Sequence, residues 1–169
     1  MTPAGHAAAE GPRGMSSPSR GEDTMTDTVG HDAALRWREL AAEECAQRLS
    51  SASMGRVGWT VGGLQQILPV SYAMDAGRVV FRTSAYGALA HLRHPTNVAF
   101  EIDQVDAAAG TGWSVVVQGS AHAVVLPQEL VDLWARPDIV PWAPGTRNVF
   151  IAITVHALSG RVAQAPFAA

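Results

Sequence analysis

The stretch GRVGWTVGGLQQILPVSYAMDAGRVVFRT, residues 55–83, decides the fold class. It consists of short apolar or alternating runs separated by clusters of turn-forming residues, which is typical of antiparallel strands. The pairs Gly62-Gly63 and Ala76-Gly77 suit tight hairpin turns, because glycine adopts positive φ at no steric cost. The predicted strands are 55–61, 66–74 and 78–83.

The same pattern continues toward the C-terminus. It predicts three further strands, at 97–103, 112–125 and 147–157. Three helices are predicted: 33–50, with Asp32 as its cap and leucines at roughly helical spacing, then 86–93, and 127–134 with Pro127 in its first turn. Six strands and a few short helices make a mainly β domain. We expect a six-stranded antiparallel sheet that closes or half-closes into a barrel, since closure removes exposed strand edges.

The first 30 residues differ in composition from the rest. Residues 1–30 contain Gly, Pro, Ser, Thr, Ala and scattered charges, with almost no large apolar side chains. Such a segment buries too little surface to offset its ordering entropy, so we expect a disordered tail. Residues 31–169 then form one folded domain, and Met25 is an alternative start for the chain.

Charge and cysteine content exclude several classes of function. The net charge is -3, the pI is near 6.0, and the chain has 12 arginines and no lysine, which argues against a nucleic-acid-binding protein. Cys45 is the only cysteine, and the six histidines lack metal-ligand spacing, so we predict no metal site. No apolar stretch approaches the ~20 residues of a membrane span and no secretory signal is evident, so we expect a cytoplasmic protein without membrane contact.

An ordered series of motifs carries a family resemblance. The series is Met54-Gly55-Arg56-Val57-Gly58, Leu68-Pro69-Val70-Ser71-Tyr72, Val80-Phe81-Arg82-Thr83, Ala99-Phe100-Glu101-Ile102-Asp103, Gly112-Trp113-Ser114-Val115, Gly119-Ser120-Ala121, Pro141-Trp142-Ala143-Pro144-Gly145 and Ser159-Gly160-Arg161. In this order the motifs resemble the pyridoxamine 5'-phosphate oxidase-like, FMN-binding split-barrel proteins, especially their small actinobacterial branch. The similarity spans about residues 35–161.

The resemblance implies a homodimer with FMN bound in grooves between two barrels. By analogy with the family, residues 69–72 would run beside the isoalloxazine ring, and Arg82 with Thr83 would lie near the phosphate. Trp113 and Ser114 would flank the ring or ribityl chain, and Trp142 and Arg147 would approach from the partner or a closing loop. The cofactor-binding residues implied in this way are Pro69, Val70, Ser71, Tyr72, Arg82, Thr83, Ser84, Leu89, Trp113, Ser114, Trp142 and Arg147.

One position departs from the family pattern. Ala88 stands where FMN-binding members commonly carry a lysine just before a leucine, here Leu89. The loss of one charge-assisted contact, ~1.5–3 kcal/mol, would lower FMN affinity by roughly tenfold to a hundredfold. His91, Arg93 or His94 would be the compensating groups. Three outcomes stay open: weak FMN binding, binding of a related cofactor such as a deazaflavin, or loss of the cofactor.

Two function hypotheses follow from the resemblance. The first is a flavin- or deazaflavin-dependent oxidoreductase that acts on a small organic substrate. The second is a non-catalytic protein that sequesters a flavin, deazaflavin or tetrapyrrole, because no nucleophile–base pair is evident and catalytic residues stay unassigned. Glu101 and Asp103 alternate along one strand and are interpreted as a solvated face rather than a catalytic pair.

Overall fold

A single antiparallel sheet of seven strands dominates the computed structural model, which describes residues 36–164. The strands are β1 (Arg36–Glu39), β2 (Met54–Val61), β3 (Leu64–Asp75), β4 (Arg78–Thr83), β5 (Thr96–Asp106), β6 (Thr111–Ala123) and β7 (Val149–Gln164). The helices are α1 (Ala42–Ser51), the short 3-10 helix η1 (Ala88–Arg93) and α2 (Pro127–Trp134). The tail at residues 1–30, the start at Met25 and the cap at Asp32 lie outside the described residues.

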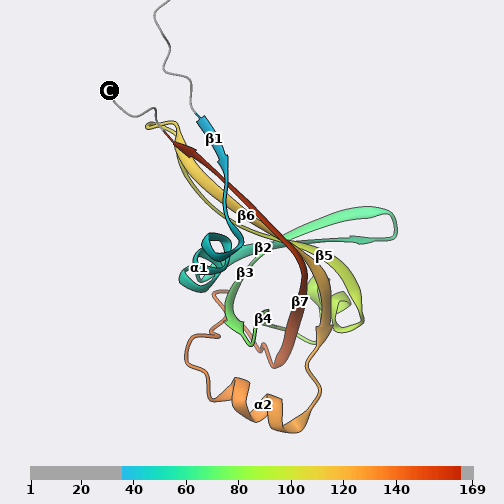
Figure 1. The fold of residues 1–169 in the computed structure, drawn as a ribbon. Coiled ribbons are helices and arrows are strands. Elements are labelled where there is room, and N and C mark those ends of the chain that lie inside the picture. Colours follow the sequence, from blue (N-terminus) through green and yellow to red (C-terminus); the bar gives the residue numbers. More distant parts are fainter. Residues whose placement is uncertain (1–35, 165–169) are drawn as a thin grey trace, which may run out of the picture. The chain divides into compact units, whose positions relative to one another are not determined.

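Six of the strands close into a ring. The strand order is β1-β7-β4-β3-β2-β5-β6, and β6 also pairs with β7, so β2 to β7 form a barrel and β1 adds to the far end of β7 (Figure 1). The mainly β, split-barrel prediction is therefore confirmed. The strand count is seven rather than six, because the prediction missed β1.

The prediction of a helix at 33–50 is wrong for its N-terminal part. Residues 36–39 form β1, whose Trp37 lies opposite Ala163 on β7, and α1 begins only at Ala42. The Glu44 carboxylate accepts a hydrogen bond from the Ala41 backbone N–H at 2.9 Å, which fixes this later helix start. Pairing with a strand more than 120 residues away overrides the local leucine spacing.

The tight turns form as predicted. Gly62 and Gly63 both have positive φ, 58° and 79°, and Ala76 and Gly77 do the same at 46° and 78°. These values give the two-residue hairpins that link β2, β3 and β4. The helix 127–134 is confirmed, whereas the one expected at 86–93 is the 3-10 helix η1.

Two apolar clusters hold the described residues together. The first fills the barrel and includes Phe81 and Phe100, both fully buried. The second lies on the opposite face of β4 and β7, where Val80 and Phe150 pack against Leu133 of α2. Strand β4 is therefore covered on both faces, which explains its continuous Val-Val-Phe run. The second cluster brings α2 close to the end of β4.

Helix α1 packs its buried face on β7. Cys45 is 1% exposed, and a Cβ added at Gly160 of β7 would lie 2.7 Å from its Sγ. Burial raises the pKa of the Cys45 thiol. The cysteine thus behaves as a small core residue.

Candidate functional site

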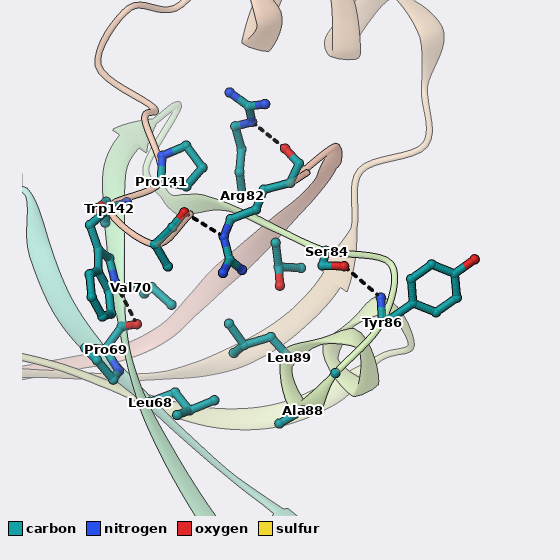
Figure 2. A pocket seen from close by; sticks show the side chains of 15 residues that line it. Leu68, Pro69, Val70, Arg82, Ser84, Tyr86, Ala88, Leu89, Pro141 and Trp142 are labelled. Atoms are coloured by element: carbon teal, nitrogen blue, oxygen red, sulfur yellow. Dashed lines mark hydrogen bonds between the residues drawn. The ribbon is translucent and has the colours of Figure 1, made fainter. Parts of the chain in front are cut away.

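A pocket of ≈ 330 Å³ opens where β3 and β4 separate (Figure 2). We call it the β3–β4 pocket. Its lining comes from β3, from the end of β4, from the turn into η1, and from the loop before β7. The lining residues are Leu68, Pro69, Val70, Ser71, Arg82, Thr83, Ser84, Tyr86, Gly87, Ala88, Leu89, Pro141, Trp142, Ala143 and Arg147.

One edge of β3 borders this pocket without a partner strand. Strand β4 pairs with β3 only from Tyr72 to Asp75, while residues 68–71 pair with β2 on their other side. On the pocket side, the Pro69 carbonyl instead accepts a hydrogen bond from the Trp142 indole Nε1 at 3.3 Å. This open edge leaves main-chain groups available to a ligand, as a strand edge does in general.

Arg82 lines the pocket, but its guanidinium points toward α2 and away from the pocket interior (Figure 2). Its Nε donates to the Arg147 carbonyl at 2.9 Å, and its guanidinium carbon lies 4.1 Å from the Trp134 ring centre and 5.5 Å from that of Phe150. Partial burial lowers the pKa of the Arg82 guanidinium, which nevertheless stays charged because arginine does not deprotonate in proteins. Within residues 36–164, no carboxylate lies within 4 Å of it and its two Nη atoms donate to no protein group.

The loop before β7 is held by its own arginine. The Arg147 Nε donates to the Ala143 carbonyl at 3.0 Å and one Nη donates to that of Pro144 at 3.2 Å. Trp142, in the same loop, is 60% exposed, and its backbone N–H donates to the Ser71 hydroxyl at 3.1 Å. These bonds tie the loop to β3 and keep the indole at the pocket mouth.

Nine of the twelve residues named by the resemblance meet in this pocket. They are Pro69, Val70, Ser71, Arg82, Thr83, Ser84, Leu89, Trp142 and Arg147. Tyr72 does not reach it: the side chain is 1% exposed, packs edge-on against Phe100 and donates its hydroxyl to the Leu49 carbonyl at 2.7 Å. Thr83 lines the pocket but is itself 1% exposed in the single chain.

Trp113 and Ser114 lie in a different hollow, which we call the β5–β6 hollow. Its volume is ≈ 480 Å³, and it also includes Trp37, Arg56 and Arg161. Arg56 forms an ion pair with Asp103 across β2 and β5. The remaining lining residues are Glu101, Asp103, Val105, Asp106, Ala107, Gly110, Thr111, Gly112 and Ala163.

The structure also locates the position that lacks the family's lysine. Ala88 lines the β3–β4 pocket at the start of η1. The candidate substitutes His91, Arg93 and His94 are exposed and are not part of the lining. The lining therefore contains two cations, Arg82 and Arg147, and the Arg82 guanidinium is turned toward Trp134 of α2.

Several residues in or next to the pocket were not predicted from the sequence. Leu68, Pro141 and Ala143 line the pocket, and their place beside the quoted motifs was a usable signal. Tyr86 lines only the rim, with its ring pointing away and 84% exposed (Figure 2). Trp134 of α2, which lies over Arg82, carried no signal because its contact depends on how α2 packs.

The described residues contain neither a membrane-spanning helix nor a metal-binding cluster. No helix within residues 36–164 is long and apolar enough to cross a membrane. In the same range, no three His, Cys, Asp or Glu side chains are grouped as a metal site requires.

The barrel, the pocket and the motif order belong to one class of protein. Residues 41–162 match the pyridoxamine 5'-phosphate oxidase family, so the chain belongs to that family and the resemblance is confirmed. The match covers the barrel strands and both hollows described above.

Individual relatives place the chain more narrowly. Rv0080, an uncharacterised protein of Mycobacterium tuberculosis, is 32% identical over 127 residues, covering 72% of this chain and 82% of the relative. The FAD binding protein from Mycobacterium smegmatis matches with a TM-score of 0.65 and 29% identity, over 75% of this chain and 98% of that one. The conserved protein of unknown function DIP1874 from Corynebacterium diphtheriae matches with a TM-score of 0.62 and 30% identity, over 76% of this chain and 98% of that one.

Proposed function

We propose that this chain binds a flavin nucleotide in the β3–β4 pocket and acts as a flavin-dependent oxidoreductase on a small organic substrate. The observation that carries the proposal is Arg147, a guanidinium that lines the pocket beside an open strand edge and forms no ion pair among residues 36–164. The FAD-binding relative at 29% identity supports the same ligand class. FMN is the proposed nucleotide, with FAD and a deazaflavin as the alternatives that the binding assay separates.

The residues present fit such a ligand. A flavin nucleotide joins an anionic phosphate to a flat ring system. The Arg147 guanidinium and the Ser84 hydroxyl suit the phosphate, since guanidinium–phosphate contacts are charge-assisted. The open edge of β3 suits the polar rim of the ring, and Leu68, Leu89 and Trp142 give it apolar surroundings.

In the proposed reaction this chain binds and orients the flavin. A bound flavin supplies the electron-transfer chemistry, and the protein tunes it through nearby charge and hydrogen bonds. Arg147 would hold the anionic end, the β3 edge would hold the ring by its main chain, and Trp142 would cover the mouth and limit the access of water. The lining contains no Asp, Glu, His or Cys, so the substrate or solvent would provide any proton.

We further propose that two copies complete the site. A volume of ≈ 330 Å³ is at the low end of the roughly 300–1,000 Å³ found for small-molecule pockets. The family residues Trp113 and Ser114 sit in the separate β5–β6 hollow, so a second copy would bring them to the first copy's pocket. Light scattering at micromolar concentration should give the mass of a dimer. A stable monomer that still binds flavin would contradict this arrangement.

Reconstitution tests the ligand. The purified protein, freed of bound small molecules by gel filtration in urea and refolded, is titrated with FMN, FAD and a deazaflavin while flavin absorbance and fluorescence are followed. We expect saturable binding of at least one flavin nucleotide. Absence of binding by all three at ~100 μM, a weak-binding range, would refute the proposal.

One observation favours a second function, sequestration without turnover. The absence of acid–base side chains from the lining suits a protein that only stores its ligand. Anaerobic reduction of the flavin-loaded protein, followed by mixing with candidate electron acceptors, separates the two. Acceptor-dependent reoxidation above the rate for free flavin supports the oxidoreductase, and equal rates across a broad acceptor set support sequestration.

A further inference from the structure

The hydroxyl of Ser71 is engaged by protein groups on both sides. Ser71 is half-buried on β3, and its Oγ accepts a hydrogen bond from the Trp142 main-chain N–H at 3.1 Å. Its proton is donated to the Sδ of Met54, which lies directly opposite on β2, at 3.3 Å. A serine hydroxyl has only one proton to donate, so the Ser71 side chain keeps no donor for a ligand.

The bond to Ser71 fixes the loop that leads to Arg147. This loop has no regular secondary structure of its own. Trp142 attaches it to β3 through two hydrogen bonds, from its main-chain N–H to Ser71 and from its indole Nε1 to the Pro69 carbonyl at 3.3 Å (Figure 2). Only the bond to Ser71 involves the main chain of the loop, so this bond sets the course of the backbone.

The same loop holds the Arg147 guanidinium. The Arg147 Nε donates to the Ala143 carbonyl at 3.0 Å, and one Nη donates to the Pro144 carbonyl at 3.2 Å. Because these two residues directly follow Trp142, their carbonyls move with its main chain. Arg147 lines the pocket, and its other Nη donates to no protein group within residues 36–164. A guanidinium held in this way loses little further freedom on binding an anion, and such preorganisation raises affinity.

We propose that Ser71 is a positioning residue that holds the Arg147 guanidinium in place for the phosphate group of the flavin nucleotide. The connection is short, since the Ser71 hydroxyl fixes the Trp142 main chain and the next two carbonyls fix Arg147. This inference rests on the proposed function, because it concerns the same pocket. It differs from the role that the family resemblance implies for Ser71, which is a contact beside the ring.

The readout is phosphate discrimination, the dissociation constant of riboflavin divided by that of FMN. Riboflavin carries the same ring and no phosphate, so a lost ring contact or a general loss of structure weakens both ligands and leaves the ratio unchanged. FAD, with a pyrophosphate in place of the monoester, replaces FMN in the ratio if the wild type prefers it. Both constants are measured by fluorescence titration on the full chain.

Ser71→Ala should lower this ratio about twofold to tenfold, the equivalent of one neutral hydrogen bond. Ser71→Thr keeps the hydroxyl and should retain the ratio, whereas Ser71→Val, which has nearly the same shape as threonine but no hydroxyl, should lower it as alanine does. Ser51→Ala is the matched control, since the Ser51 hydroxyl donates to the Arg48 carbonyl at the end of α1, outside the pocket lining. The control should leave the ratio unchanged.

A double variant tests whether Ser71 acts through Arg147. Arg147→Ala should lower the ratio more than Ser71→Ala does, because it removes the guanidinium itself. Adding Ser71→Ala to Arg147→Ala should lower the ratio no further, since the group that Ser71 positions is already absent.

The outcomes separate the inference from the proposed function. A wild-type ratio in Ser71→Ala and Ser71→Val, including equal weakening of riboflavin and FMN, overturns the positioning role while leaving flavin binding intact. A further fall of the same size in the double variant does so as well. Failure of the wild type to bind FMN, FAD and riboflavin overturns the proposed function and this inference together. The threonine and valine variants decide the result by themselves if Ser71→Ala does not fold.

Discussion

Replacing Arg147 by alanine is the perturbation that the pocket geometry defines best. The change removes a guanidinium that lines the pocket and that forms no ion pair among residues 36–164. One lost hydrogen bond to a charged group costs about 1.5–3 kcal/mol, which weakens FMN binding about tenfold to a hundredfold. The bonds to the Ala143 and Pro144 carbonyls are lost as well, so we expect the free energy of unfolding to fall by about 1–2 kcal/mol.

The assay compares variants of equal charge. FMN titrations of Arg147→Ala, Arg93→Ala and Arg161→Ala are made at one ionic strength, with urea unfolding as the check on folding. Arg93 is exposed on η1 outside the pocket lining, and Arg161 lies in the β5–β6 hollow. Only Arg147→Ala should lose the phosphate contact, and Arg147→Lys should fall between it and the wild type. Equal weakening in all three alanine variants would refute the placement of the phosphate.

Three further changes probe the fold. Gly160→Ala should lower the free energy of unfolding by about 1–3 kcal/mol in urea titrations, because its new Cβ would meet the Cys45 sulfur at 2.7 Å; unchanged stability would mean that α1 does not pack there. Tyr72→Phe should lower the free energy of unfolding by about 1–3 kcal/mol in the same assay, since it leaves the buried Leu49 carbonyl without its hydrogen-bond donor. Flavin binding at an unchanged affinity would confirm that the hydroxyl is structural, and weakened binding would contradict it. The Arg38 guanidinium and a main-chain N–H lower the pKa of Glu44 to about 2 from 4.5. A carboxylate whose pKa is lowered in the folded state stabilises the folded protein above pH 4.5, and this stabilisation disappears as the pH falls toward about 2. The wild type should therefore lose its stability advantage over Glu44→Gln across that pH window. A difference in the free energy of unfolding that does not change with pH would contradict the ion pair.

The hairpins were predictable because their signals are local. Gly62-Gly63 and Ala76-Gly77 fix positive φ within the turns themselves, and the strands on either side follow from alternation. The helix at 127–134 was equally local, with its proline at the first position. Strand β1 was not predictable, since its partner is the far end of β7 and its own sequence has leucine neighbours at helical spacing.

The site was predictable to the extent that the motifs surround one gap between strands. The middle of β3 and the end of β4 meet in the pocket because β4 pairs with β3 only from Tyr72 onward. Tyr72 fell outside because it lies where that pairing begins and its ring is buried against Phe100. Trp134 was missed because the packing of α2 on Phe150, which no local pattern encodes, brings it to Arg82.

The most direct test of the account is a crystal structure of the full chain with FMN, or with FAD if that binds more tightly. The account predicts the phosphate within hydrogen-bonding distance of the Arg147 guanidinium and the ring along the open edge of β3, in the β3–β4 pocket. A flavin whose phosphate lies in the β5–β6 hollow of the same chain, away from Arg147, would contradict it.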